Sequence, residues 1–301
     1  MVKFAAAEGS VLMPAPVVRG PLRHVLLGTP TGPRRDPPER ALEWAGPAQR
    51  GTARDVALLR EGGYLRLAVP ADLGGEGLNL RQVACAQRQL AARAPGAALA
   101  VIAHHARVGA AADTLGCGHG DAAMERLLSE AARGRFFAGC GPEELGSLTC
   151  DPPGGTFAAG MFGWGLPLAG MTFYAMARQA FDLAVQRAHR AQGAQRAGGA
   201  DAGGGHKPGH PLDQWPVAEA ALRLDSIRGQ LDEVIAGWQL RATASGALTS
   251  LDPGGQWLIR LFTVRHAAAD GARRVTELAA QIAGQGADPV GPVEPVPGRA
   301  G

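Results

Sequence analysis

Apolar side chains recur every three or four positions through the second half of the chain, which is the spacing of a helix with one buried face. The pattern is clearest in residues 160–190, where the expected buried positions are Phe173, Met176, Ala177, Ala180, Phe181, Ala184 and Val185. Phe and Met alternate with Ala along this face, so the segment is predicted to be a long core helix packed against other helices.

Two further long helices with the same periodicity follow. The first carries Val217, Ala221, Leu224, Ile227, Leu231, Val234 and Trp238; the second, which Asp252 and Pro253 cap and start, carries Leu261, Val264, Ala268, Ala272, Val275, Leu278 and Ile282. Residues 191–209 are rich in Gly and Ala and are expected to form a flexible surface linker. Residues 159–286 are therefore predicted to form a C-terminal antiparallel helical bundle.

In residues 51–134, short stretches with the apolar spacing of a helix alternate with residues that favour turns. The first helix is expected to end at Gly62 and Gly63, after which residues 64–69 are expected to run extended. A glycine-rich turn follows at residues 71–77. This half is predicted to be an N-terminal helical domain.

Three more helices are expected beyond that turn. Asn79 caps one, Pro95 separates it from the next, and Asp121 caps the third. The single candidate strand is RFFAGC at residues 135–140. The predicted fold class is mainly α.

The two ends of the chain lack helical periodicity. Residues 1–50 are rich in Pro, Gly and Arg and are expected to be loosely ordered, and residues 287–301 are expected to be a disordered tail. No window resembles a membrane span or an export signal. The four Cys show no CxxC spacing, which is typical of reduced thiols in a cytoplasmic protein.

Charge and chemistry-bearing residues narrow the function classes. A net charge of +3, without a stripe of Arg and aromatic residues, disfavours nucleic-acid binding. Residues His104, His105, Cys117 and His119 lack an i, i+4 ligand pair, so a structural or surface role is expected rather than metal binding. The tryptophans on the helix faces are expected to be core residues: Trp164, Trp215, Trp238 and Trp257.

Several segments, taken in order, resemble the acyl-CoA dehydrogenase family. LREGGYLRLAVPADLGGEGLNLRQV (59–83) resembles part of its amino-terminal helical domain, and RFFAGCGPEELG (135–146) resembles the entry to its middle β domain. Residues 160–190, 210–219 and 273–286 are similar to successive helices of its carboxy-terminal bundle. The ordered set covers most of residues 50–286, and it is more specific than any one of its motifs.

The resemblance implies an FAD-dependent oxidoreductase that desaturates the α,β bond of an acyl-CoA thioester. It implies a homo-oligomer, either dimer or tetramer, with an electron-acceptor flavoprotein as a further partner. The family's middle β domain is largely missing here. Only residues 135–158 are expected to remain of it.

The resemblance also places candidate site residues. Arg190 matches an arginine that contacts the cofactor diphosphate, a contact well suited to a guanidinium. Gln281 and Gly284 match a segment that approaches the FAD of a neighbouring subunit, although Gln285 replaces that segment's second glycine. The loop from Glu143 to Ser147 is read as a solvated turn. No catalytic base is assigned, because neither position of the family's glutamate has a counterpart.

Two alternatives stay open. A flavin-dependent monooxygenase resembling dibenzothiophene monooxygenase would need no glutamate base, because a flavin hydroperoxide performs the oxidation. A non-catalytic helical bundle that keeps only the family's oligomer interface would explain both the missing domain and the missing base.

Overall fold

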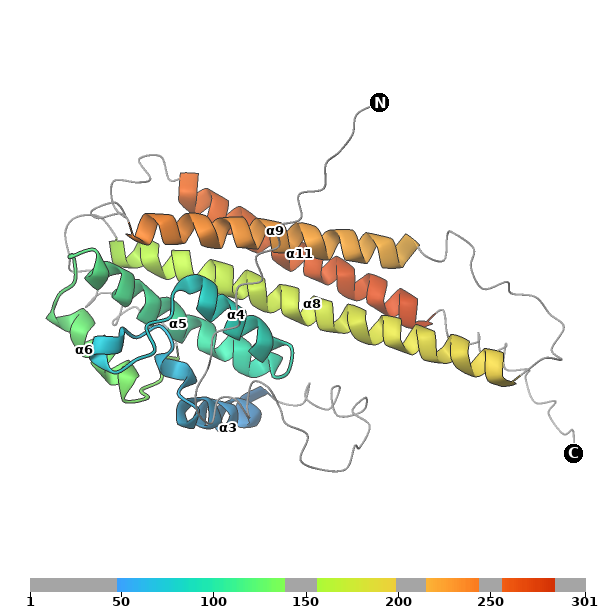
Figure 1. Cartoon of the computed structure of the whole chain (residues 1–301), viewed down its shortest axis with the longest axis horizontal. Coiled ribbons are helices and arrows are strands. Elements are labelled where there is room, and N and C mark those ends of the chain that lie inside the picture. Colours follow the sequence, from blue (N-terminus) through green and yellow to red (C-terminus); the bar gives the residue numbers. More distant parts are fainter. Residues whose placement is uncertain (1–47, 139–155, 199–214, 244–255, 285–301) are drawn as a thin grey trace, which may run out of the picture.

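The computed structural model describes residues 48–138, 156–198, 215–243 and 256–284. These ranges hold helices and connecting turns with no strand, which confirms the predicted mainly α fold class. The elements are α3 (Ala48–Glu61), η1 (Tyr64–Arg66), η2 (Ala71–Leu73), α4 (Leu80–Ala91), α5 (Pro95–Gly116), α6 (Ala122–Ala132), α8 (Thr156–Gly198), α9 (Trp215–Thr243) and α11 (Gln256–Gly284). Figure 1 shows α8, α9 and α11 lying side by side, with α4 and α5 against the first half of α8 and with α3 and α6 packed on α5.

Helix α8, 43 residues long, joins the two halves of the fold. Two of its glycines mark close approaches to other helices, since a Cβ atom added there would meet a neighbour. At Gly160 it would lie 2.9 Å from Ala110 of α5, and at Gly163 it would lie 2.3 Å from the Trp238 ring of α9. One hydrophobic core consequently runs through both halves, from Leu59 to Ile282.

The predicted helix starts at α4 and α6 are confirmed. Asn79 Oδ1 accepts the Gln82 N–H at 3.1 Å while Gln82 Oε1 accepts the Asn79 N–H at 3.0 Å, a reciprocal capping box. Asp121 Oδ1 accepts the N–H groups of Ala123 and Met124, each at 2.9 Å. These bonds satisfy donors that a helix N-terminus otherwise leaves unpaired.

The extended run expected at residues 64–69 is wrong. Gly63 has φ of 76°, and the chain turns there into the short 3₁₀ helix η1. Successive i to i−3 bonds close the segment: Arg66 N–H to Gly63 O at 3.2 Å, and Val69 N–H to Arg66 O at 3.2 Å. The left-handed glycine that ends α3 redirects the chain, and this outweighs the strand-like composition of the segment.

The candidate strand is also wrong where the structure describes it, because residues 135–138 have no regular secondary structure. The Phe137 N–H points to the ring nitrogen Nδ1 of His104 at 3.4 Å, and the described part of the chain contains no second strand for it to pair with. Residues 139–155, which include the Glu143 to Ser147 loop, lie outside the described residues. The predictions for residues 1–47, 199–214 and 285–301 lie outside them as well.

Helix α8 is longer than predicted, because residues 191–198 continue it instead of beginning a linker. Ala, Gln and Arg, which favour helices, make up most of residues 191–198. They extend α8 beyond Val185, its last large apolar side chain.

The predicted buried face of α8 is confirmed only in part. Ala177, Phe181 and Ala184 are buried, but Met176 is 36 % exposed and Phe173 is half-buried. The buried positions face α9 and α11, whereas Met176 and Phe173 lie on a neighbouring stripe. On α11, by contrast, all seven predicted positions are buried.

The prediction that four tryptophans are core residues is confirmed for three of them. Trp164, Trp238 and Trp257 are buried, while Trp215, the first residue of α9, is 64 % exposed.

In the described residues, no helix combines the length and apolar character needed to cross a membrane.

Candidate functional site

The predicted cofactor residues lie at one end of the bundle. Arg190 is in the last turns of α8, and Gln281 and Gly284 are in the last turn of α11, which runs in the same direction as α8 (Figure 1). All three residues are exposed. A Cβ added to Gly284 would have no described neighbour within 4 Å, so no close backbone approach requires a glycine there.

These three residues do not fit a flavin within a single copy of the described chain. Bound ligands are normally enclosed over most of their surface, whereas Arg190, Gln281 and Gly284 are all exposed in one copy, and none of them lines the pocket described below. We therefore derive no catalytic step through FAD.

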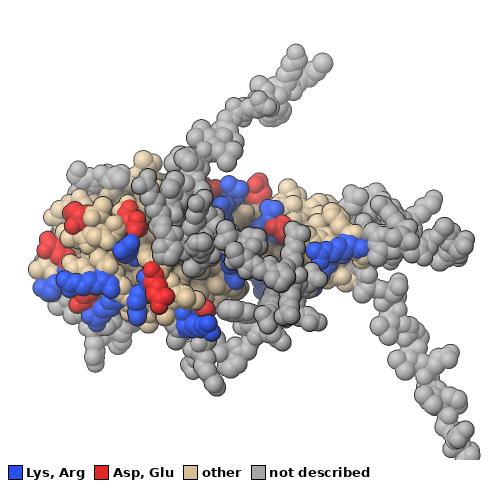
Figure 2. Space-filling model, turned by 60° about the horizontal axis from the view of Figure 1, so that its bottom comes forward, with Lys and Arg blue, Asp and Glu red and all other residues tan. Residues whose placement is uncertain are grey.

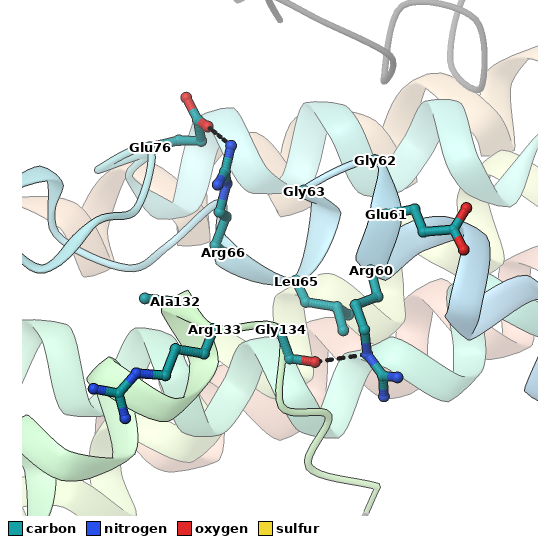
Figure 3. Close-up of a pocket in the computed structure, with 10 residues that line it drawn as sticks. All are labelled: Arg60, Glu61, Gly62, Gly63, Leu65, Arg66, Glu76, Ala132, Arg133 and Gly134. Atoms are coloured by element: carbon teal, nitrogen blue, oxygen red, sulfur yellow. Dashed lines mark hydrogen bonds and ion pairs between the residues drawn. The ribbon is translucent and has the colours of Figure 1, made fainter.

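The pocket that the described residues do form lies elsewhere, between the end of α3, η1 and the end of α6 (Figure 3). It has a volume of about 250 Å³ and is lined by three arginines and two glutamates, with Leu65 and glycines between them. Its size falls below the roughly 300–1,000 Å³ of most small-molecule sites, so its dimensions suit a small anion and not a dinucleotide.

Two of the three pocket arginines are already engaged. Arg60 Nε donates to the Gly134 carbonyl at 2.8 Å, and Arg66 pairs with Glu76 at 3.3 Å (Figure 3). The Arg133 guanidinium makes no hydrogen bond or ion pair with another described residue, and it extends away from Arg60 in Figure 3. The arginines consequently do not converge on one point. Basic and acidic side chains are likewise interspersed on the face in Figure 2.

A buried amide connects four elements of the fold. Gln87 of α4 accepts the Tyr64 hydroxyl at 2.9 Å and donates to Ala98 O at 2.7 Å and to Thr172 Oγ1 at 3.0 Å. Burial alone raises the pKa of Tyr64, so its hydroxyl stays protonated and keeps donating. Sequence reasoning missed Gln87, because nothing in its local pattern distinguishes it from a surface glutamine.

The adjacent histidines lie beside this amide and are both buried. His104 Nε2 lies 2.6 Å from Leu65 O, so Nε2 carries the proton and Nδ1 accepts the Phe137 N–H. Burial is the main cause that lowers the pKa of His104 to about 4, against the raising effect of the Leu65 hydrogen bond.

His105 differs from His104 because neither of its ring nitrogens has a hydrogen-bond partner within the described chain. Its ring lies edge-on to Tyr64, with centroids 5.1 Å apart, and burial holds its pKa well below the usual value. In the residues described, no three His, Cys, Asp or Glu side chains gather as metal ligands. The two histidines are core residues of the N-terminal half.

A second buried polar centre is formed around Asp113 of α5. Its Oδ2 accepts the indole N–H groups of Trp164 at 2.7 Å and Trp238 at 3.1 Å, which joins α5 to α8 and α9. Burial raises the pKa of Asp113, and the two indole bonds partly oppose this shift. One turn later, the thiol of Cys117 donates to Ala242 O at 3.3 Å, and burial followed by the Asp113 charge raises its pKa.

Buried carboxylates with a raised pKa are candidates for general bases. Asp113 is instead committed to the fold, because its Oδ2 accepts both indole N–H groups and it does not line the pocket between α3, η1 and α6. We assign it a structural role.

Compared with known proteins, the chain matches no family model, and neither a curated protein nor a solved structure gives a significant match.

Proposed function

We propose that this chain is a shortened member of the acyl-CoA dehydrogenase family, an FAD-binding oxidoreductase scaffold of the cytoplasm that functions as an assembly of copies. The resemblance in sequence order is the basis of the proposal. The observation that carries it furthest is that α8 packs against both the amino-terminal helices and α9 and α11, so the two groups of similar segments belong to one hydrophobic core. A chance series of weak motifs would not require that arrangement.

The exposure of the predicted cofactor residues supports a site shared between copies. Arg190, Gln281 and Gly284 lie at the same end of the bundle and remain open to solvent, as residues awaiting a second copy would. FAD would lie against this end, with Arg190 contacting its diphosphate and α11 approaching its adenine and ribose. The proposed substrate is an acyl-CoA thioester, and the middle β domain is proposed to be largely missing.

A non-catalytic bundle is the second candidate, and one observation favours it. The partly buried carboxylate of Asp113, whose pKa is raised, is held by two indole N–H groups and does not line the described pocket. In this case the chain would keep the helical assembly without the chemistry.

The visible absorption spectrum of the purified protein, before and after addition of FAD, separates these two candidates and the monooxygenase alternative. A bound flavin whose colour bleaches on anaerobic addition of acyl-CoA supports the dehydrogenase. A flavin that acyl-CoA leaves unchanged, that exchanges with NADH-derived reduced flavin and that then consumes oxygen on a substrate supports the monooxygenase. A colourless protein that takes up no added FAD contradicts the flavoprotein proposal and supports the non-catalytic bundle.

A further inference from the structure

One stripe of apolar side chains on α8 is covered only in part by the described residues: Leu166, Phe173 and Ala180 pack partly against the core, while Phe162, Met176 and Leu183 are exposed. Its seven members alternate steps of four and three positions, which is the repeat of a helix-pairing seam: Phe162, Leu166, Ala169, Phe173, Met176, Ala180 and Leu183. Phe162 and Leu183 are each 41 % exposed, and none of the seven is fully buried. At a rise of about 1.5 Å per residue, the stripe extends over roughly 30 Å.

The other faces of α8 are occupied by neighbouring helices. A Cβ added to Gly165 would lie 3.3 Å from Ala106 of α5, and one added to Gly170 would lie 2.6 Å from Leu231 of α9 and 3.4 Å from Ala268 of α11. The stripe therefore runs between α5 on one side and α11 on the other. Its exposure is not a consequence of α8 standing apart from the core.

Side chains of α11 extend the apolar surface at one edge of the stripe. The rings of Phe162 and Phe262 have centroids 5.6 Å apart, and Phe262 is itself 46 % exposed. The Arg265 guanidinium lies 5.6 Å above the Phe173 ring. In α8 itself, residues 160–177 contain no charged side chain. A partner for this surface must consequently be apolar along most of its length.

We propose that the partner is a second copy of this chain, with the two α8 stripes antiparallel. About a two-fold axis at the level of Met171, Phe162 faces Ala180 of the second copy and Ala169 faces Phe173. Leu166 then faces Met176, and Leu183 faces Ala159. Three of these four kinds of layer join a large side chain to a small one, and the fourth joins the unbranched Met176 to Leu166, so no layer places two aromatic rings or two alanines together.

A parallel pairing lacks this complementarity. Phe162 would meet Phe162 of the second copy, and Ala169 would meet Ala169, so crowded layers would alternate with empty ones. The antiparallel pair is also isologous, which means that the same surface serves both copies and the assembly closes as a dimer. The pairing gives the proposed assembly of copies one face. It sets the two Arg190 residues about 57 Å apart along α8, so it does not by itself complete the proposed cofactor site and does not require that FAD is bound.

Charge substitutions on the full-length chain test both the face and the direction of pairing. Phe162→Lys alone and Ala180→Glu alone each place a charge in an apolar layer, and each is expected to weaken self-association by about tenfold or more. In the double variant, each introduced lysine faces the introduced glutamate of the other copy, so association is expected to return. Within one copy the two positions lie about 27 Å apart along α8, too far to pair.

Size-exclusion chromatography with light scattering over a dilution series gives the dissociation constants. The matched control is Leu222→Lys on α9, a leucine that is 69 % exposed away from the stripe, and it is expected to leave association unchanged. Far-ultraviolet circular dichroism and melting temperature verify that each variant is folded. A monomeric wild type, folded single variants that still associate, or a double variant that stays dissociated would each overturn the proposal. FAD uptake measured on the same samples reports separately on the flavoprotein proposal.

Discussion

Asp113 accepts the indole N–H of Trp164 at 2.7 Å, which ties α5 of the amino-terminal half to α8 of the bundle. The indole of Trp238 donates to the same oxygen at 3.1 Å, so three helices meet at one carboxylate. Because both indole donors are buried, removal of their common acceptor leaves them without a partner. This carboxylate is a structural junction between the two halves of the fold.

The first prediction concerns that junction. Asp113→Ala is expected to lower the free energy of unfolding by about 2 kcal/mol or more, because two buried donors lose their acceptor. Asp113→Asn keeps an acceptor oxygen and is expected to lower it much less. Urea unfolding of both variants tests this, and equal losses for Ala and Asn would show that the hydrogen bonds do not stabilise the fold.

The pKa shift of Asp113 adds a pH dependence to this comparison. Burial raises the pKa of Asp113 in the folded state above 3.8, so the folded state binds more protons than the unfolded state just above that pH. The stabilisation from this group is therefore present at low pH and is lost as pH rises through the folded-state pKa. Asp113→Asn should remove this component, which the difference between the two stability–pH curves measures.

The second prediction concerns the buried histidines and has the opposite sign. The folded-state pKa of His104 is about 4 and that of His105 lies well below 6.5, so the unfolded state binds more protons below pH 6.5. Stability should fall as pH decreases from 6.5 toward 4, by at most about 1.4 kcal/mol per pH unit for each histidine. His105→Phe should reduce this slope. If the slopes of variant and wild type coincide, His105 is not held neutral by burial.

The third prediction tests the close packing of α5 against α8. A Cβ at Gly109 would lie 2.1 Å from the Trp164 ring, so Gly109→Ala should destabilise the fold by about 1–3 kcal/mol. Gly229→Ala is the matched control on an exposed face of α9, with no described atom within 4 Å. It should stabilise the protein by roughly 0.5–1 kcal/mol, because alanine favours the helix. Thermal and urea unfolding give both values, and a neutral Gly109→Ala would contradict the packing.

The fourth prediction concerns the proposed cofactor contacts. Arg190→Ala should weaken FAD binding by about tenfold or more, because a guanidinium makes charge-assisted hydrogen bonds with a diphosphate. Arg187→Ala, which removes another exposed arginine of α8, serves as the control and should leave binding unchanged. Fluorescence titration with FAD measures both. Equal effects of the two substitutions would indicate only a general loss of positive charge.

Periodicity and capping signals predicted much of the fold from the sequence. All seven expected core positions of α11 are buried, and Asn79 and Asp121 cap helices as expected, because these features depend on residues a few positions apart. On α8, two adjacent apolar stripes have similar composition. The sequence did not distinguish the stripe that α9 and α11 cover from the one that carries Met176.

The buried polar centres could not be predicted in this way. Gln87 and Thr172 are 85 positions apart, and Asp113 and Trp238 are 125 apart, so the tertiary fold alone brings them together. The proposed cofactor site would depend in addition on assembly of copies. Arg190, Gln281 and Gly284 reach the same end of the bundle, but what completes a site there is not contained in one described copy.

Size-exclusion chromatography of the protein mixed with FAD, monitored by light scattering and by the visible flavin band, tests the central claim most directly. The account predicts that flavin elutes with a dimer or larger assembly and that Arg190→Ala reduces the amount retained. Flavin that elutes entirely apart from the protein, at protein concentrations where the chain is assembled, would contradict it.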